Sequence, residues 1–115
     1  MVLSKDQIFA ADDLKTVEVD VPEWSGTVKL RTMSGGEREQ YFRTLMKHKA
    51  DDIPKNLFQV LVIICAVDDD GNQLFNMEDL PGLSKKNGAV LDRLTKAAGD
   101  LNGLTDQSID ELAGE

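Results

Sequence analysis

The chain has 115 residues, a formal net charge of −8 and a pI near 4.6, so we expect one domain over residues 1–115, loosely ordered at 1–12 and 106–115. The negative charge argues against nucleic-acid binding, because phosphate contacts depend on clustered lysine and arginine. The lone Cys65 excludes a disulfide framework, and the longest apolar run, residues 57–67, is too short to span a membrane, so we predict a soluble protein of a reducing cytoplasm.

The first clear pattern is an alternation of apolar and charged residues over residues 16–33. Three valines alternate with Glu18 and Asp20, and after the loop PEWSGT two apolar residues alternate with Lys29 and Arg31. An antiparallel hairpin would place one apolar face inward and opposite charges across the ladder. The predicted pairs are Val21 with Val28, Val19 with Leu30, Asp20 with Lys29, and Glu18 with Arg31.

A helix is predicted to follow the hairpin. Ser34 and Glu37 have the spacing of a capping box at its start. Its apolar stripe comprises Tyr41, Phe42, Leu45 and Met46. The basic residues 47–49 suit the negative end of the helix dipole. We interpret His48, the only histidine, as a solvated helix-end residue, because no motif places a nucleophile or carboxylate beside it.

The segment AVDDDGNQLF, residues 66–75, has two interpretations. As a type I′ hairpin centred on Asp70 and Gly71, it pairs Val67 with Leu74 and continues a strand that follows a helix over Pro54–Ile63. As a calcium loop it lacks two ligands, since Ala66 and Met77 occupy the first and last ligand positions. The turn is therefore favoured, and calcium binding remains the alternative.

The C-terminal part reads as helical. Asn76 can cap a short turn over Met77–Leu80, which Pro81-Gly82 would end. Ser84 is predicted to cap a longer helix, with Gly103 at its left-handed end and Leu104 folding back. Its apolar face comprises Val90, Leu91, Leu94, Ala97, Ala98 and Leu101.

The residues alone thus predict an α+β fold: an N-terminal β-hairpin, helices, a second short β-hairpin and a C-terminal helical region. No paired nucleophile and base, metal-ligand spacing, phosphate cradle or cofactor motif is present in the sequence. We therefore predict a protein that is not an enzyme, takes no cofactor or metal, and works by binding.

Four residues are candidate partner contacts. Trp24, between Pro22 and Gly26 in the hairpin loop, is the first to test, because tryptophan is enriched at interface hot spots. Its alternative role is to fold back over the hairpin as part of the core. Leu91, Leu94 and Leu101 belong to an apolar stripe that packs either into the core or against another subunit.

Three segments carry a resemblance to a known family. They are LSKDQIFAADDLKTVEVDVPEWSGTVKLRTMSGGERE near the N-terminus, VDDDGNQLF, and KKNGAVLDRLTKAAGDLNGL before the acidic tail. With these three segments in this order, the chain resembles the tail assembly chaperones of long-tailed, siphovirus-type bacteriophages. The match covers most of the chain and rests on ordered segments rather than on a catalytic signature.

The resemblance implies a non-structural viral protein of the host cell cytoplasm, absent from the mature virion. Such chaperones self-associate and hold the tape measure protein soluble until the tail tube polymerises around it. In many relatives a ribosomal frameshift adds an extension that contacts the tail tube protein. The chain ending at Glu115 is expected to be the short product.

A function from another class also fits the charge. A small acidic regulatory protein could inhibit a basic or DNA-binding partner, which co-purification with such a partner would reveal. No nucleic acid and no membrane is expected as a partner under either function.

Overall fold

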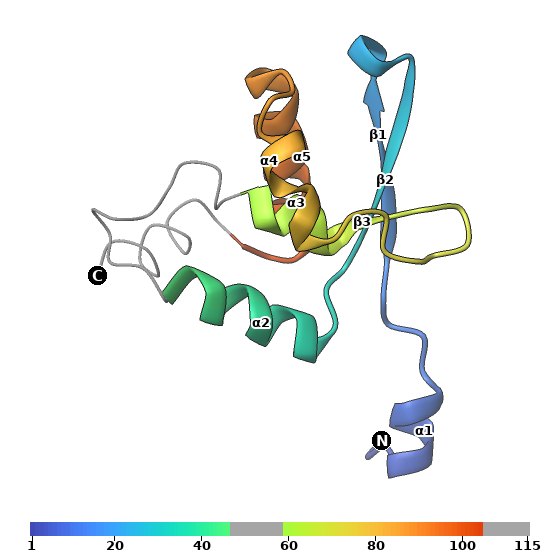
Figure 1. The fold of residues 1–115 in the computed structure, drawn as a ribbon. Helices are drawn as coiled ribbons and strands as arrows, with labels where there is room; N and C mark the ends of the chain where they lie inside the picture. Colours follow the sequence, from blue (N-terminus) through green and yellow to red (C-terminus); the bar gives the residue numbers. More distant parts are fainter. Residues whose placement is uncertain (47–58, 105–115) are drawn as a thin grey trace.

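The computed structural model describes residues 1–46 and 59–104 of the chain (Figure 1). The elements, in chain order, are α1 (Lys5–Ala10), β1 (Thr16–Val21), η1 (Pro22–Trp24), β2 (Gly26–Arg31), α2 (Gly35–Met46), α3 (Val60–Cys65), β3 (Ala66–Val67), η4 (Met77–Asp79), α4 (Leu80–Leu83) and α5 (Gly88–Leu101). The predicted α+β fold class is confirmed.

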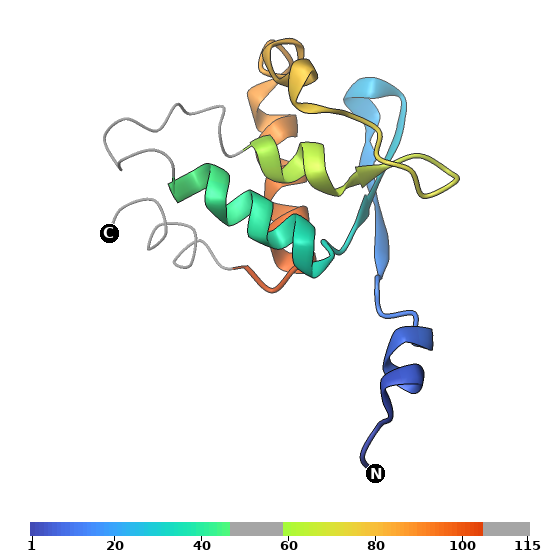
Figure 2. The same cartoon turned by 60° about the horizontal axis from the view of Figure 1, so that its bottom comes forward.

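The sheet is antiparallel, with the strand order β1-β2-β3. The long β1–β2 hairpin stands beside the helices, and β1 forms its outer edge (Figures 1 and 2). Helix α1 precedes β1 and projects away from the rest of the molecule. The structure thus consists of a packed body and a projecting N-terminal arm, residues 1–14.

The hairpin itself is confirmed, but its predicted register is wrong by two residues. Val19 pairs with Val28, Val17 with Leu30, and Val21 with Gly26. The loop is shorter than PEWSGT because Pro22–Trp24 forms a 3-10 turn and Ser25 adopts a left-handed φ of 59°. A two-residue shift keeps each side chain on its expected face, since strand side chains alternate with a period of two.

The shift changes the charge pairs across the hairpin. Glu18 lies opposite Lys29, and Asp20 lies opposite Thr27. Arg31, which the sequence predicted to face Glu18, instead donates to both carboxylate oxygens of Glu37 at 2.8 Å. The strand is thereby tied to the start of α2.

The capping box at the start of α2 is confirmed. The amide of Ser34 donates to Glu37 Oε1 at 2.9 Å, and the amide of Glu37 donates to Ser34 Oγ at 3.2 Å. Of the predicted stripe, Tyr41 is fully buried, Phe42 is half-buried and Met46 is 67% exposed. The side chain of Leu45 and residues 47–49, including His48, lie outside the described part.

Helix α3 runs two residues further than predicted, to Cys65, before β3 begins. The β-branched residues at its end favour a strand, yet every residue from Val60 to Cys65 is buried. Packing of this kind outweighs intrinsic propensity, which is worth less than 1 kcal/mol per residue for such side chains. The predicted helix start, residues 54–58, lies outside the described residues.

The predicted type I′ turn at Asp70-Gly71 is wrong. Val67 pairs with Gln73, and the amide of Asp68 donates to the carbonyl of Asn72 at 2.8 Å, so residues 69–71 form the tip of the loop. In this loop only Gly71 has positive φ (85°). Asp68 Oδ1 accepts from the amides of Asp70 and Asn72, each at 2.9 Å. This Asx-type arrangement stabilises the longer loop and moves the returning strand by one residue.

That one-residue slip reverses the faces beyond the loop. Phe75 packs against the core, whereas Leu74 is 49% exposed. The predicted partnership of Val67 with Leu74 would have buried Leu74 instead.

The first C-terminal turn begins at Met77 as predicted, but the later helix boundaries differ from the prediction. Asn76 caps η4 with a capping box, as expected, but Pro81 occupies the first turn of α4 and does not end the helix there. Asn87, not Ser84, caps α5 by accepting from the amides of Ala89 and Val90. The hydroxyl of Ser84 donates to the carbonyl of Leu80 at 2.8 Å and so closes the preceding turn.

The end of α5 is confirmed. Gly103 has a φ of 71°, and the amide of Leu104 donates to the carbonyl of Gly99 at 2.7 Å. The amide of Gly103 donates to the carbonyl of Asp100, which completes a Schellman motif. Leu104 folds back and is only 5% exposed.

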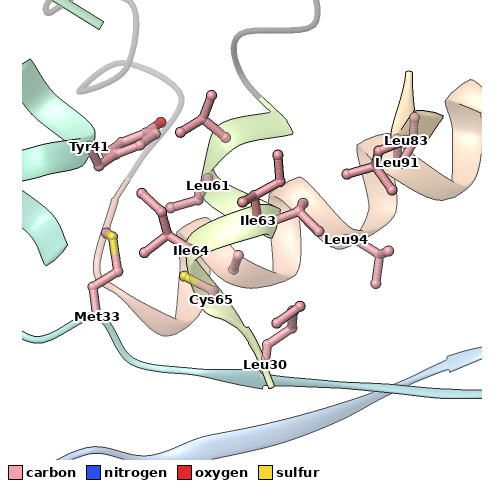
Figure 3. Packing of buried hydrophobic residues seen from close by; sticks show 14 of the residues in the cluster. Leu30, Met33, Tyr41, Leu61, Ile63, Ile64, Cys65, Leu83, Leu91 and Leu94 are labelled. Carbon is pink, nitrogen blue, oxygen red and sulfur yellow. The ribbon is translucent and has the colours of Figure 1, made fainter. Parts of the chain in front are cut away.

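The core centres on α3, which contacts α2, α5 and β2. Figure 3 shows its side chains between Tyr41 of α2 and the leucines of α5, with Leu30 of the sheet on a third side. Asn102, the buried polar residue of this core, accepts from the amide of Met33 at 2.7 Å and donates to the carbonyl of Ala98 at 2.8 Å. It joins the end of α5 to the start of α2.

Candidate partner-binding surfaces

The described residues offer little for catalysis. In residues 1–46 and 59–104, no group of three or more His, Cys, Asp or Glu side chains could hold a metal ion. Asp68, a ligand in the calcium interpretation, instead uses Oδ1 to hold its own loop. The carboxylate of Asp79 accepts from the amide of Asn76 as part of a cap.

The buried titratable groups are held in their neutral forms. Burial raises the pKa of the Cys65 thiol to about 11, although its hydrogen bond from Asn102 opposes the rise. Burial also raises the pKa of Tyr41 to about 12. A thiol with this pKa has little thiolate at neutral pH, so Cys65 acts as a core residue and not as a nucleophile.

Trp24 is positioned by a short, well-anchored turn at the tip of the hairpin. The amide of Ser25 donates to the carbonyl of Pro22 at 3.0 Å, closing the turn. The guanidinium of Arg93 in α5 donates to both carboxylate oxygens of Glu23, at 3.0 and 2.8 Å. This ion pair holds the turn against α5, and its hydrogen bonds lower the pKa of Glu23 to about 2.

The turn forms one wall of an open hollow, which we call the Trp24 hollow. Its volume is about 410 Å³, and its lining residues are Trp24, Phe75, Asp79, Gly82, Leu83 and Lys86. The lining is mostly apolar, with one acidic and one basic side chain. Trp24 also packs partly against the core, which was its alternative role, and its contact with a partner stays a prediction.

The other candidate contacts lie within the body. Leu91 and Leu94 are 2% and 1% exposed, and Leu101 is partly buried against the core. Leu91 and Leu94 belong to the face of α5 that packs on α3 (Figure 3). The structure therefore brings none of these three leucines into the Trp24 hollow.

A second hollow lies along α2 and was not predicted as a surface. It has a volume of about 540 Å³ and is lined by Gly35, Arg38, Glu39, Phe42, Arg43 and Met46. Arg38 lies over the ring of Phe42, 5.4 Å from its centroid. We call this surface the α2 groove. The sequence indicated this surface only through the predicted apolar stripe, which includes Phe42 and Met46 and is wider than the side of α2 that faces the core.

The N-terminal arm is a third apolar surface that sequence reasoning missed. Ser4 and Gln7 form a capping box, so the spacing S-x-x-Q could have revealed α1. No residue of α1 is buried, and Phe9 is 78% exposed. In the described part of the chain, no helix is long and apolar enough to cross a bilayer.

Comparison with known proteins identifies the family. The model of the phage tail assembly chaperone family matches residues 2–115. No curated protein matches the chain in sequence. Among solved structures, the chain is similar to the bacteriophage HK97 tail assembly chaperone, with a TM-score of 0.60 and 27% identity over 88% of this chain and 95% of that one. Because the family model matches nearly the whole chain, the chain belongs to the phage tail assembly chaperone family.

Proposed function

We propose that this protein is a non-enzymatic chaperone that self-associates and binds the tape measure protein of its phage. It keeps that protein soluble until the tail tube polymerises, acts in the host cytoplasm, and is absent from the finished virion. The single observation that carries the proposal is the family match over residues 2–115. A longer, frameshifted form would add contact with the tail tube protein.

The α2 groove is the surface we assign to the tape measure protein. A long helical client presents apolar side chains at helical spacing, and such helices bind in apolar grooves. Phe42 and the exposed Met46 supply the apolar floor. Arg38 flanks it, as does Arg43, which is ion-paired with Glu39 of the same groove, so the flanks carry one net positive charge. The groove thus suits an amphipathic helix that carries acidic residues beside its apolar stripe.

The overall charge supports the same function. Many copies gathered on one client would come close to one another, and a net charge of −8 opposes their random clumping. The charge alone would also suit the alternative, a regulatory inhibitor of a basic partner. No feature of the described surface favours that alternative.

Co-expression with the tape measure protein tests the proposal. The tape measure protein should precipitate alone, and remain soluble and co-elute with the wild-type chaperone. Met46→Asp should abolish co-elution by placing a charge in the groove, whereas Gln40→Asp, an exposed change on α2 outside the groove, should not.

The outcomes distinguish a failure of the proposed function from a failure of the proposed binding surface. Precipitation of the tape measure protein in the presence of the wild-type protein would overturn the function. Equal binding by the Met46→Asp and Gln40→Asp variants would overturn only the assignment of the groove. Recovery of a DNA-binding host protein in place of the tape measure protein would favour the regulatory alternative.

A further inference from the structure

The helix of the N-terminal arm is capped by Ser4 and Gln7 but buries none of its side chains. Helix α1 has six residues and no buried side chain. Helices shorter than about 12 residues are marginal in water, and most gain their stability from packing of an apolar face. Leu3 and Ile8 are 53% and 54% exposed, and Phe9 is 78% exposed. Such an arm requires a surface on which to pack.

The Trp24 hollow offers an apolar surface of suitable charge. Residues 1–14 contain Asp6, Asp12 and Asp13 against one base, Lys5. The turn at the rim of the hollow carries Lys85 and Lys86, of which Lys86 lines the hollow. In the described ranges, no ion pair involves these three aspartates or these two lysines. Asp79 also lines the hollow, so Asp79, Lys85 and Lys86 together leave the rim with one net positive charge. This charge complements the arm, whose side chains carry a net charge of −2.

The arm cannot reach the hollow of its own chain. Lys15 is held at the far end of the hairpin, because its amide and carbonyl are hydrogen-bonded to Thr32. The five steps from Ala10 at the end of α1 to Lys15 span at most about 18 Å, whereas the six residues of β1 span about 20 Å. Figure 1 shows α1 and η1 at opposite ends of the hairpin.

We propose that the arm of one copy docks in the Trp24 hollow of a second copy, with Phe9 inserted between Trp24 and Phe75. Each copy then uses two different surfaces, so the interface is heterologous and can extend from copy to copy. This inference rests on the self-association in the proposed function and adds the surfaces that produce it. It leaves the α2 groove free for the client.

One variant and a matched control test the arm's side of this contact. Phe9→Asp should raise the dissociation constant for self-association by about 30-fold or more, as expected for loss of an interface hot spot. Ala10→Asp adds the same charge to the exposed neighbour in the same helix and should associate like the wild type. Sedimentation velocity over a range of protein concentrations gives the constants.

The hollow can be blocked without disturbing Trp24. Gly82 lines the hollow, and a Cβ placed there meets no atom within 4 Å, so Gly82→Gln should fold and cover the hollow. Gly36→Gln, at an equally open glycine at the start of α2, is the matched control. Circular dichroism should show all four variants folded.

The decisive experiment mixes the Phe9→Asp variant with the Gly82→Gln variant. The Phe9→Asp variant keeps an intact hollow, and the Gly82→Gln variant keeps an intact arm. Each alone should be monomeric, and their mixture should form dimers of one copy of each and no larger species. Self-association of the Phe9→Asp variant at wild-type strength, or a mixture that stays monomeric, would overturn the proposed contact while wild-type association stands. A wild-type protein that is monomeric at every concentration would instead overturn self-association itself.

Discussion

Helices α1 and α5 begin in similar ways but differ in their environments. Both have a capping side chain at the start, Ser4 in α1 and Asn87 in α5. Helix α5 buries five residues against the core, whereas α1 buries none. A cap therefore determines where a helix starts, and burial determines how much the helix adds to the stability of the chain.

The largest expected effect comes from removing packed side chains of α5. Leu94→Ala should lower the free energy of unfolding by about 2 to 5 kcal/mol, because Leu94 is 1% exposed and leaves a cavity. Phe9→Ala in the arm should change it by less than about 0.5 kcal/mol. Urea unfolding at a protein concentration below self-association measures both values. Comparable losses in the two variants would show that the arm packs within its own chain.

A smaller loss is expected at the polar centre of the core. Asn102→Ala leaves the buried amide of Met33 without its acceptor, which should cost about 1 to 3 kcal/mol. Hydrogen exchange at the Met33 amide should become faster in the same variant. Asn72→Ala, at an exposed position in the 68–72 loop, is the control and should leave both quantities near the wild-type values.

The two caps allow a matched test of the comparison. Asn87→Ala should lower the stability of the whole chain by about 1 kcal/mol, because α5 is part of the core. Ser4→Ala should reduce the helicity of the arm and leave the unfolding midpoint unchanged. Urea unfolding and the NMR chemical shifts of residues 5–10 distinguish the two effects. An equal shift in midpoint for both variants would contradict the division into body and arm.

Local chemistry in the sequence predicted the elements well. The alternation over residues 16–31, the Ser34–Glu37 box and the Gly103 terminus each act within a few residues, so the sequence alone shows them. Loop closures were harder to predict. Trp24 ends a 3-10 turn, and Asp68 binds two amides of its own loop, and each arrangement shifted a register.

The candidate surfaces depend on contacts between distant segments, which the pattern of one sequence does not specify. The Trp24 hollow combines the hairpin tip with residues 75–86, and no local periodicity joins these two segments. Trp24 was found because tryptophan is common at interfaces. The arm was missed because its apolar residues are few and α1 is short, although its capping box was visible.

The smallest expected effect concerns the ion pair that holds the Trp24 turn to α5. Hydrogen bonds from Arg93 lower the pKa of Glu23 from its ordinary 4.5 to about 2, so the pair adds stability above pH 4.5 and loses it as the pH falls towards 2. Arg93→Met should return the pKa of Glu23 towards its ordinary value and flatten this part of the pH dependence. Because the pair is exposed, the change in stability at neutral pH should be slight.

An NMR titration of the Glu23 side-chain carboxyl measures this pKa directly. Lys96→Met, which breaks the exposed pair with Asp100 on the same helix, is the control and should leave the Glu23 titration unchanged. If the pKa of Glu23 is the same in the Arg93→Met variant as in the wild type, the turn is held by the packing of Trp24 alone. A shifted pKa together with weaker self-association would show that the ion pair keeps the wall of the hollow in place for the arm of the next copy.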